Sequence, residues 1–263
     1  LDSIEKEAKE EQQELTPFSE LTVSGLDFAL ADRKLFEELS FKMKRGQILA
    51  IAGESGRGKT TLAKLLLGKR QVDRGSIFLG EKEIKSLSKS TIYQEVMYVS
   101  ANSVLLNASI IENLQLAVDW SRGEIEGWLA ENGVLAFVRD LPQGLDTLVG
   151  ENGSQLSPGQ RQQIICVRAI LAKRSLYLFD EVTSSVDKDN EAAIYDLLTL
   201  VAQDALVIEI THKMKQVAKA SQVLFIGKET TVLGTPAEVY EQSEEYRQLA
   251  NTQQELEKLT HGN

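Results

Sequence analysis

The chain has 263 residues, of which 42% are hydrophobic, and its formal net charge is −10. This size and composition suit one large α/β domain, and the acidic balance argues against a general nucleic-acid or anionic-membrane surface. The single cysteine, Cys166, excludes a disulfide framework within the chain and is expected to be a small buried residue. No apolar run approaches the length of about 20 residues that spans a bilayer. Because the chain begins at Leu1 in mid-pattern, we expect it to be part of something longer.

Residues 1–17 are charged and rich in glutamine, and they end at Pro17. Their apolar residues fall near one helical face: Leu1, Ile4, Ala8 and Leu15. We interpret this segment as a linker helix. A disordered acidic tail is an equally good interpretation. The main domain is expected to cover 18–263.

Strand-like and helix-like segments then alternate along the chain. Apolar or alternating patterns predict strands at 21–30, 39–43, 47–51, 76–79, 96–100, 176–179, 205–210, 223–226 and 231–233. Helices are predicted at 60–67, at 187–201 and near the C-terminus. The segment from about 103 to 172 is mostly helical and predicts a lobe that interrupts the sheet. This alternation predicts an α/β fold with a largely parallel sheet covered on both faces.

A glycine-rich segment lies between a predicted buried strand and a predicted helix. It consists of Gly53, Glu54, Ser55, Gly56, Arg57, Gly58, Lys59, Thr60 and Thr61. These residues fit the pattern G-x-x-x-x-G-K-[ST], in which glycines let backbone N–H groups surround phosphate oxygens. The next helix presents its positive N-terminus to the same anion. We therefore predict ATP binding, with Lys59 at the β- and γ-phosphates and the Thr60 hydroxyl on Mg²⁺.

Acidic and histidine side chains follow two later predicted strands. The strand at 176–179 ends in Asp180 and Glu181. Asp180 is placed to hold Mg²⁺, directly or through water. Glu181 projects differently and is predicted to polarise an attacking water, the alternative being a solvated charge. His212 follows the strand at 205–210, where we favour a contact with the γ-phosphate over a structural role.

Several further segments, in the same order along the chain, resemble the ATPase domain of ABC transporters. Residues 156–163 are similar to the signature motif of that family, usually L-S-G-G-Q. Residues 180–187 resemble its Walker B motif and D-loop, and residues 210–212 resemble its switch-histidine loop. Residues 107–114 and 147–153 are similar to the exporter branch. Together these motifs identify the chain as a member of that family.

The resemblance implies a P-loop NTPase fold with three parts. These are a mainly parallel central sheet, an antiparallel β subdomain on the N-terminal side, and an inserted helical subdomain at about 103–172. It also implies a head-to-tail dimer, in which ATP lies between the phosphate loop of one subunit and the signature of the other. Ser157, Gly159 and Gln160 would then face the partner's ATP, with help from the helix N-terminus near Pro158.

The same resemblance implies a membrane setting. Exporters carry a transmembrane domain, in the same chain or in a separate subunit, and the ATPase domain lies at the cytoplasmic face of the membrane. Dimer closure driven by ATP would be passed to that domain. The implied cofactors are ATP and Mg²⁺, no nucleic-acid partner is expected, and the transported substrate is not indicated.

Three positions depart from the family pattern. Ala101 stands where the family has a glutamine near Mg²⁺ and the attacking water, and Asn102 is a substitute only if the loop shifts. Leu30 stands where an aromatic ring stacks on adenine, a loss of about 1 kcal/mol, and a core role is expected for the nearby Phe28. Pro158 replaces a glycine of the signature and removes one backbone donor, so weaker binding of the partner's ATP is expected.

Alternative functions remain open. The departures fit one member of an asymmetric pair, and a non-hydrolysing half that regulates a heterodimeric transporter is the main alternative to an active ATPase. A soluble ABC protein of translation or DNA maintenance is disfavoured by the exporter-like segments and the acidic surface. A P-loop kinase or GTPase is disfavoured because no N-K-x-D occurs and the signature would be unexplained.

Overall fold

The computed structural model describes residues 14–30, 33–228 and 230–261. The predicted linker helix at 1–17 lies almost wholly outside these residues. Leu15, which lies within them, is buried in non-helical chain and packs into a core shared with the first sheet.

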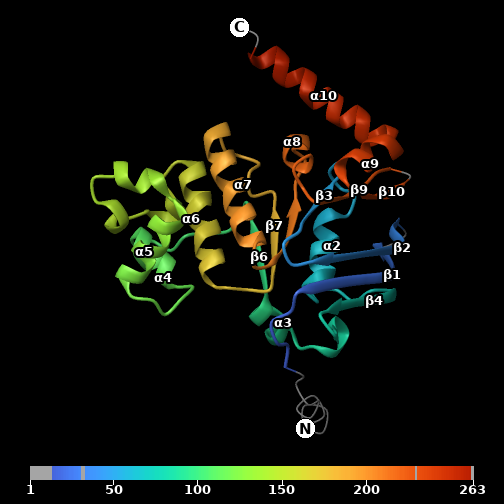
Figure 1. The fold of residues 1–263 in the computed structure, drawn as a ribbon, viewed down its shortest axis with the longest axis horizontal. Coiled ribbons are helices and arrows are strands. Elements are labelled where there is room, and N and C mark those ends of the chain that lie inside the picture. Colours follow the sequence, from blue (N-terminus) through green and yellow to red (C-terminus); the bar gives the residue numbers. More distant parts are fainter. Residues whose placement is uncertain (1–13, 31–32, 229, 262–263) are drawn as a thin grey trace.

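An antiparallel sheet of four strands stands on the N-terminal side of the molecule (Figure 1). Its order is β2-β1-β4-β5. The strands are β1 (Glu20–Leu30), β2 (Arg33–Lys44), β4 (Arg74–Leu79) and β5 (Lys82–Glu83). Along β1, the buried Leu21 and Val23 alternate with the partly exposed Thr22, as expected for a sheet with one packed face.

The central sheet has six strands in the order β10-β9-β3-β8-β7-β6. The first five in chain order are parallel, and β10 is antiparallel to β9. The strands are β3 (Ile48–Ala52), β6 (Val96–Ser100), β7 (Leu176–Asp180), β8 (Leu206–Ile210), β9 (Gln222–Ile226) and β10 (Thr231–Gly234). Every residue of β3, β7 and β8 is buried, which is the pattern of parallel strands covered on both faces.

Two hydrophobic cores lie on opposite faces of this central sheet. Ile48 and Ala50 of β3 face a core shared with α6 (Pro158–Leu171) and α7 (Lys188–Ala202). Leu49 and Ile51 face a core shared with α2 (Lys59–Leu66) and the antiparallel sheet. The remaining helices of the body are α3 (Lys89–Glu95), α8 (Met214–Val217), α9 (Pro236–Gln242) and α10 (Glu244–His261). Helices α2 and α6 therefore cover different faces of the sheet (Figure 1).

The segment between β6 and β7 is helical. It contains α4 (Ile110–Gln115), α5 (Arg122–Asn132) and α6, with short 3₁₀ turns at Ala136–Asp140, Gly144–Asp146 and Glu151–Gly153. Each of the three α-helices begins with a capping box, in which an N-cap serine and a Glu or Gln three residues later bond each other's backbone N–H. These sequence-encoded starts define the helices of the inserted segment, and its predicted bounds of about 103–172 stay a prediction.

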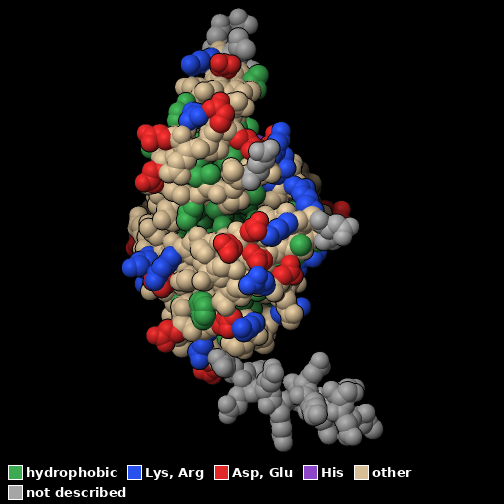
Figure 2. Space-filling model, turned by 90° about the vertical axis from the view of Figure 1, so that its right-hand side faces the viewer, with side chains coloured by type: hydrophobic (Ala, Val, Ile, Leu, Met, Phe, Trp, Pro, Cys, Tyr) green, Lys and Arg blue, Asp and Glu red, His purple; other side chains and the backbone are tan. Residues whose placement is uncertain are grey.

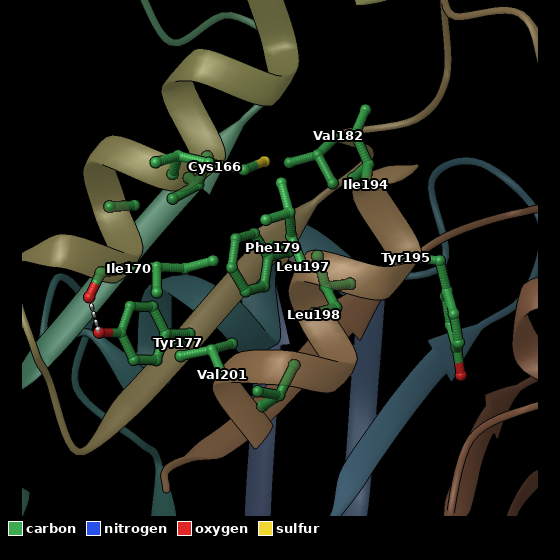
Figure 3. Close-up of a cluster of buried hydrophobic side chains, with 14 of the residues drawn as sticks. Cys166, Ile170, Tyr177, Phe179, Val182, Ile194, Tyr195, Leu197, Leu198 and Val201 are labelled. Carbon is green, nitrogen blue, oxygen red and sulfur yellow. Dashed lines mark hydrogen bonds between the residues drawn. The ribbon is translucent and has the colours of Figure 1, made fainter. Parts of the chain in front are cut away.

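The core between α6, α7 and β7 contains the single cysteine (Figure 3). Cys166 is fully buried, as predicted, and burial raises the pKa of its thiol to about 12. Beneath it, the rings of Tyr177 and Phe179 stack with centroids 6.0 Å apart. The Tyr177 hydroxyl donates to the Ile170 carbonyl at 3.3 Å, which satisfies the polar end of a buried ring.

The fold class predicted from the sequence is confirmed. A mainly parallel central sheet, an antiparallel sheet on the N-terminal side and an inserted helical segment are all present. Within the described ranges, no helix combines the length and apolar character needed to cross a membrane.

Candidate nucleotide-binding site

The predicted phosphate loop connects the end of β3 to the start of α2. Gly58 is the N-cap of α2, with φ of 101°, and it supplies no side-chain hydrogen bond to the helix. The first N–H groups of a helix have no partner within it. At α2 they are therefore left for a ligand, and the helix dipole favours an anion there.

Two glycines of the loop are required by their surroundings. A Cβ on Gly53 would lie 2.3 Å from the Ile226 carbonyl oxygen, and its φ of +143° also disfavours other residues. A Cβ on Gly58 would lie 3.2 Å from the Phe36 ring at a φ of +101°. The loop is thus held close to the end of β9 and to the antiparallel sheet.

Lys59 is buried at the base of the loop. Its Nζ donates to the carbonyl oxygens of Gly53 at 2.7 Å and Glu54 at 2.9 Å. Burial lowers the pKa of Lys59, while the carboxylates of Glu181 and Asp180 act in the opposite direction. The cation is therefore held inside the loop, next to the space that phosphates would enter. Its contact with β- and γ-phosphates stays a prediction.

The predicted metal ligands meet at one carboxylate oxygen. Asp180 Oδ2 accepts hydrogen bonds from Thr60 Oγ1 at 3.2 Å and from the Tyr98 hydroxyl at 2.8 Å. Thr60 begins α2, Asp180 ends β7, and Tyr98 lies on the neighbouring strand β6. Burial and the hydrogen bond to Asp180 raise the pKa of Tyr98 well above its usual value, so the phenol stays the donor.

This donor set fits Mg²⁺. The ion prefers oxygen ligands and is bound through one or two carboxylates together with substrate phosphates. A threonine hydroxyl and an aspartate carboxylate, next to a phosphate-binding loop, are oxygen ligands of that kind. Thr60 and Asp180 are the residues that would hold the ion.

The backbone changes direction at Glu181, directly after the end of β7. Its φ of 53° lies in the left-handed region, at a cost of about 1 to 3 kcal/mol, and its N–H donates to the Ile210 carbonyl at 2.9 Å. The side chain is 40% exposed, and its Oε1 lies 3.8 Å from His212 Nδ1. The two predicted catalytic side chains are therefore neighbours.

Lys59, Thr60 and Glu181 line one pocket of about 400 Å³. Its lining consists of Leu30, Arg33, Leu35, Ser55, Gly56, Gly58, Lys59, Thr60, Thr61 and Glu181. Leu30 is 45% exposed whereas Phe28 is buried, so Leu30 is the side chain that this part of β1 presents to the pocket. Glu54 and Arg57, both predicted to bind the cofactor, pair with each other at 3.0 Å.

The loop after β6 meets the site through its backbone. The Ala101 N–H donates to the Asp180 carbonyl at 3.2 Å, and the methyl side chain offers no polar atom. Asn102, the substitute considered for the missing glutamine, is exposed.

The predicted signature residues lie elsewhere, at the start of α6. Ser157 Oγ accepts from the Gln160 N–H at 3.1 Å, and Gln160 Oε1 accepts from the Ser157 N–H at 3.0 Å. A Cβ on Gly159 would lie 2.2 Å from Asn190 of α7, so this glycine is required by packing within the chain. Because α6 and α2 cover opposite faces of the sheet, the structure does not bring Ser157, Gly159 and Gln160 together with the phosphate loop.

Two residues of the site were missed from the sequence. Tyr98 contacts Asp180 as described. Gln253 of α10 donates to the His212 carbonyl at 2.6 Å and accepts from the Met214 N–H at 2.9 Å, so it holds the loop that carries His212. The alternation along β6 places Tyr98 on the same face as Ser100, which pairs with Asp180, but no pattern links Gln253 to a loop about 40 residues earlier.

Comparison with known proteins identifies the family to which the chain belongs. Residues 36–184, more than half of the chain, match the family described as ABC transporter. The chain belongs to the ABC transporter family. A solved structure of a bacterial Atm1-family ABC exporter with ATP bound has a TM-score of 0.80 and 27% identity. The match covers 92% of this chain and 44% of that one, and it assigns the chain to the exporter-type nucleotide-binding domains.

Curated relatives point the same way. The ATP-dependent lipid A-core flippase of Photobacterium profundum is 34% identical over 225 residues, which are 84% of this chain and 38% of the relative. The protein of the same name from Desulfotalea psychrophila is 31% identical over 252 residues, covering 95% of this chain and 44% of the relative. The ABC domain therefore spans about two fifths of the length of these relatives.

Proposed function

We propose that this ABC domain hydrolyses Mg-ATP to power export of a substrate across a membrane through a transmembrane domain. The observation that carries the proposal is the contact of Thr60 with Asp180 beside a phosphate loop whose pocket also contains Glu181. Its relatives named as ATP-dependent flippases support an energy-consuming function, and they give no support to the non-hydrolysing alternative.

Each part of the pocket has a role in phosphoryl transfer. The loop N–H groups and Lys59 bind and orient the phosphates, and Thr60 and Asp180 hold Mg²⁺. When bound, the ion neutralises charge on the phosphate oxygens. Glu181 orients and polarises the attacking water, and His212, 3.8 Å from it, faces the γ-phosphate. Three chain segments, the phosphate loop with the start of α2, the end of β7 and the loop after β8, would thus act on one phosphate group.

A second copy of an ABC domain completes the site. The N-terminus of α6 is a second potential anion site, but it lies on the other side of the sheet from α2. It can serve an ATP bound to the phosphate loop only if that loop belongs to a partner. Ala101, Leu30 and Pro158 weaken parts of this arrangement, so we propose that the partner is a non-identical domain with an intact signature.

An exposed apolar surface supports the proposal that a transmembrane domain docks on this side of the helical segment. Val104, Leu106 and Leu148 are 54%, 53% and 55% exposed. Residues 108–110 and 147–149 hydrogen bond to each other, which brings Leu148 beside this segment. Val104 follows Ala101 by a few residues, and Ala101 contacts Asp180. A helix bound to this surface would therefore be linked by a short stretch of chain to the ATP site.

The charge distribution supports the proposal that the domain has no nucleic-acid partner. Acidic and basic side chains are intermixed on the face drawn in Figure 2, without a broad basic field. The net charge of −10 points the same way. With a transmembrane partner, the domain would sit at the cytoplasmic face of the membrane. The relatives are named for lipid A-core, but in exporters the transmembrane domain selects the substrate, so we propose none.

Substitution of Glu181 by Gln tests the proposal. The variant should bind Mg-ATP as tightly as the wild type and lose at least about 100-fold in phosphate release, because the water is no longer polarised. Glu131→Gln, on the exposed face of α5, is the matched control and should keep full activity. Wild-type chain that retains one ATP without releasing phosphate would favour the regulatory half instead. Robust, cooperative hydrolysis by the chain alone would remove the basis for a non-identical partner.

A further inference from the structure

Tyr98 is partly buried on β6, the edge strand of the central sheet, and it reaches the end of the neighbouring strand β7. Its hydroxyl donates to Asp180 Oδ2 at 2.8 Å, the same oxygen that accepts from Thr60 Oγ1 at 3.2 Å. In the described part of the chain, no protein group bonds the other carboxylate oxygen of Asp180. Two donors from different elements thus fix one oxygen and leave the other open.

The sheet register explains how the ring reaches this point. Tyr98 pairs with Leu178 and Ser100 pairs with Asp180, so Tyr98 lies two positions back along the neighbouring strand. Side chains two apart share one face of a sheet, and this face is the one covered by α2. A tyrosine is long enough to cover that distance along the face and deliver a hydroxyl to the strand end.

Packing contacts also hold the ring of Tyr98 in place. It packs against the core beneath α2, and Lys69, which follows that helix, places Nζ 5.4 Å from the ring centroid. The position of the hydroxyl is therefore set by packing rather than by the hydrogen bond alone. A rigid donor orients its acceptor more strongly than a mobile one does.

The neighbouring loop offers no comparable group. Ala101 reaches Asp180 only through its backbone N–H, and Asn102 is exposed. We propose that Tyr98 is a positioning residue of the Mg-ATP site, which fixes the Asp180 carboxylate for the metal where the adjacent loop contributes no side chain. The inference rests on the proposed function, because it concerns the Mg²⁺ that the site uses with ATP.

The inference predicts a selective effect on the metal. Without the hydroxyl, Asp180 can rotate, and binding of Mg²⁺ must first restore its orientation. Tyr98→Phe should therefore raise the Mg²⁺ concentration needed for half-maximal tightening of nucleotide binding by about tenfold, the effect of one hydrogen bond to a charged group. Nucleotide binding in the presence of EDTA should not change, because the phosphate loop and Lys59 are intact.

The experiment is a Mg²⁺ titration of the full chain with a fluorescent ATP analogue, repeated without metal, and with thermal unfolding as a check of the fold. Tyr93→Phe is the matched control. Tyr93 is also a tyrosine beside Lys69, with Nζ 5.9 Å from its ring, but it is 40% exposed and does not bond Asp180. This control should leave the Mg²⁺ dependence unchanged.

The possible results separate the inference from the function on which it rests. A shift confined to Tyr98→Phe and to the metal-dependent step supports the inference. An unchanged Mg²⁺ dependence in Tyr98→Phe, or an equal loss of binding with and without metal, overturns it and leaves the proposed function standing. If wild-type chain binds nucleotide with no response to Mg²⁺, the proposed Mg-ATP function fails, and the inference fails with it.

Discussion

The starts of α2 and α6 are two helix N-termini that differ in how their own chain treats them. At α2 the N-cap is Gly58, which supplies no side-chain bond, so the first N–H groups are left open. At α6 the N-cap Ser157 and Gln160 bond each other's backbone, and Pro158 removes a further donor. Both ends carry the partial positive charge that attracts phosphate. The difference indicates that α2 is prepared for a ligand, whereas α6 must give up internal bonds to take one.

The surroundings of α2 are also more open to a ligand than those of α6. The start of α2 contains the buried Lys59 and lies opposite Asp180 at the end of the parallel strand β7. The start of α6 lies against α7, where Gly159 packs on Asn190 and Gln163 Nε2 donates to Asn190 Oδ1 at 2.6 Å. The start of α2 borders an open pocket, whereas the start of α6 is packed against α7. Occupation of the start of α6 therefore depends on a partner that brings the phosphate.

The largest expected effect comes from the open helix end. Lys59→Met removes the buried cation, so ATP binding should weaken by at least about 100-fold, the effect of losing charge-assisted contacts to phosphate. Lys64→Met makes the same change on the exposed face of α2 and should bind ATP normally. Calorimetric titration with ATP measures both. Wild-type affinity in Lys59→Met would show that the loop does not bind phosphate as proposed.

Strand β8 of the central sheet, on its face toward α7, contains a buried group that should make the stability of the chain depend on pH. Glu209 of β8 is 1% exposed, and within the described residues its carboxylate oxygens have no hydrogen-bond partner. Burial raises its pKa from 4.5 to about 8, and Glu191 adds to the rise, while Lys213 and Lys219 oppose it. Between these two values the folded chain keeps a proton that the unfolded chain releases. The free energy of unfolding should therefore fall as pH rises through this window.

Glu209→Gln should remove that dependence. The amide keeps the shape of the side chain but does not ionise, so its stability advantage over wild type should grow by about 1 kcal/mol for each pH unit from roughly pH 5 to pH 8. Urea unfolding at several pH values measures the difference, with Glu131→Gln as an exposed control. Parallel stability curves for wild type and Glu209→Gln would show that Glu209 titrates normally in the folded chain.

The two regions also differ in how far the sequence alone could predict them. The phosphate loop, Asp180, Glu181 and most strands follow from local patterns, because glycine spacing and buried apolar runs are properties of short segments. The start of α6 near Pro158 was expected from the resemblance to the family's signature motif. The bond of Tyr98 to Asp180 and the hold of Gln253 on His212 depend on how distant segments pack. No local pattern encodes such contacts. None encodes the packing of Asn190 against Gly159, which requires glycine at that position.

The smallest expected effect concerns the capped helix end. Pro158→Gly restores one backbone donor to the first turn of α6, at some cost in helix stability. In a Glu181→Gln background, where ATP is retained, it should raise ATP-induced association with a partner ABC domain by a few-fold. Pro236→Gly is the matched control, since Pro236 follows the N-cap of α9, which has a capping box formed by Thr235 and Glu238. Sedimentation with and without ATP measures association. An equal effect of both substitutions would mean that proline at the signature does not limit phosphate binding, and the α6 terminus would then differ from α2 only through its serine and glutamine.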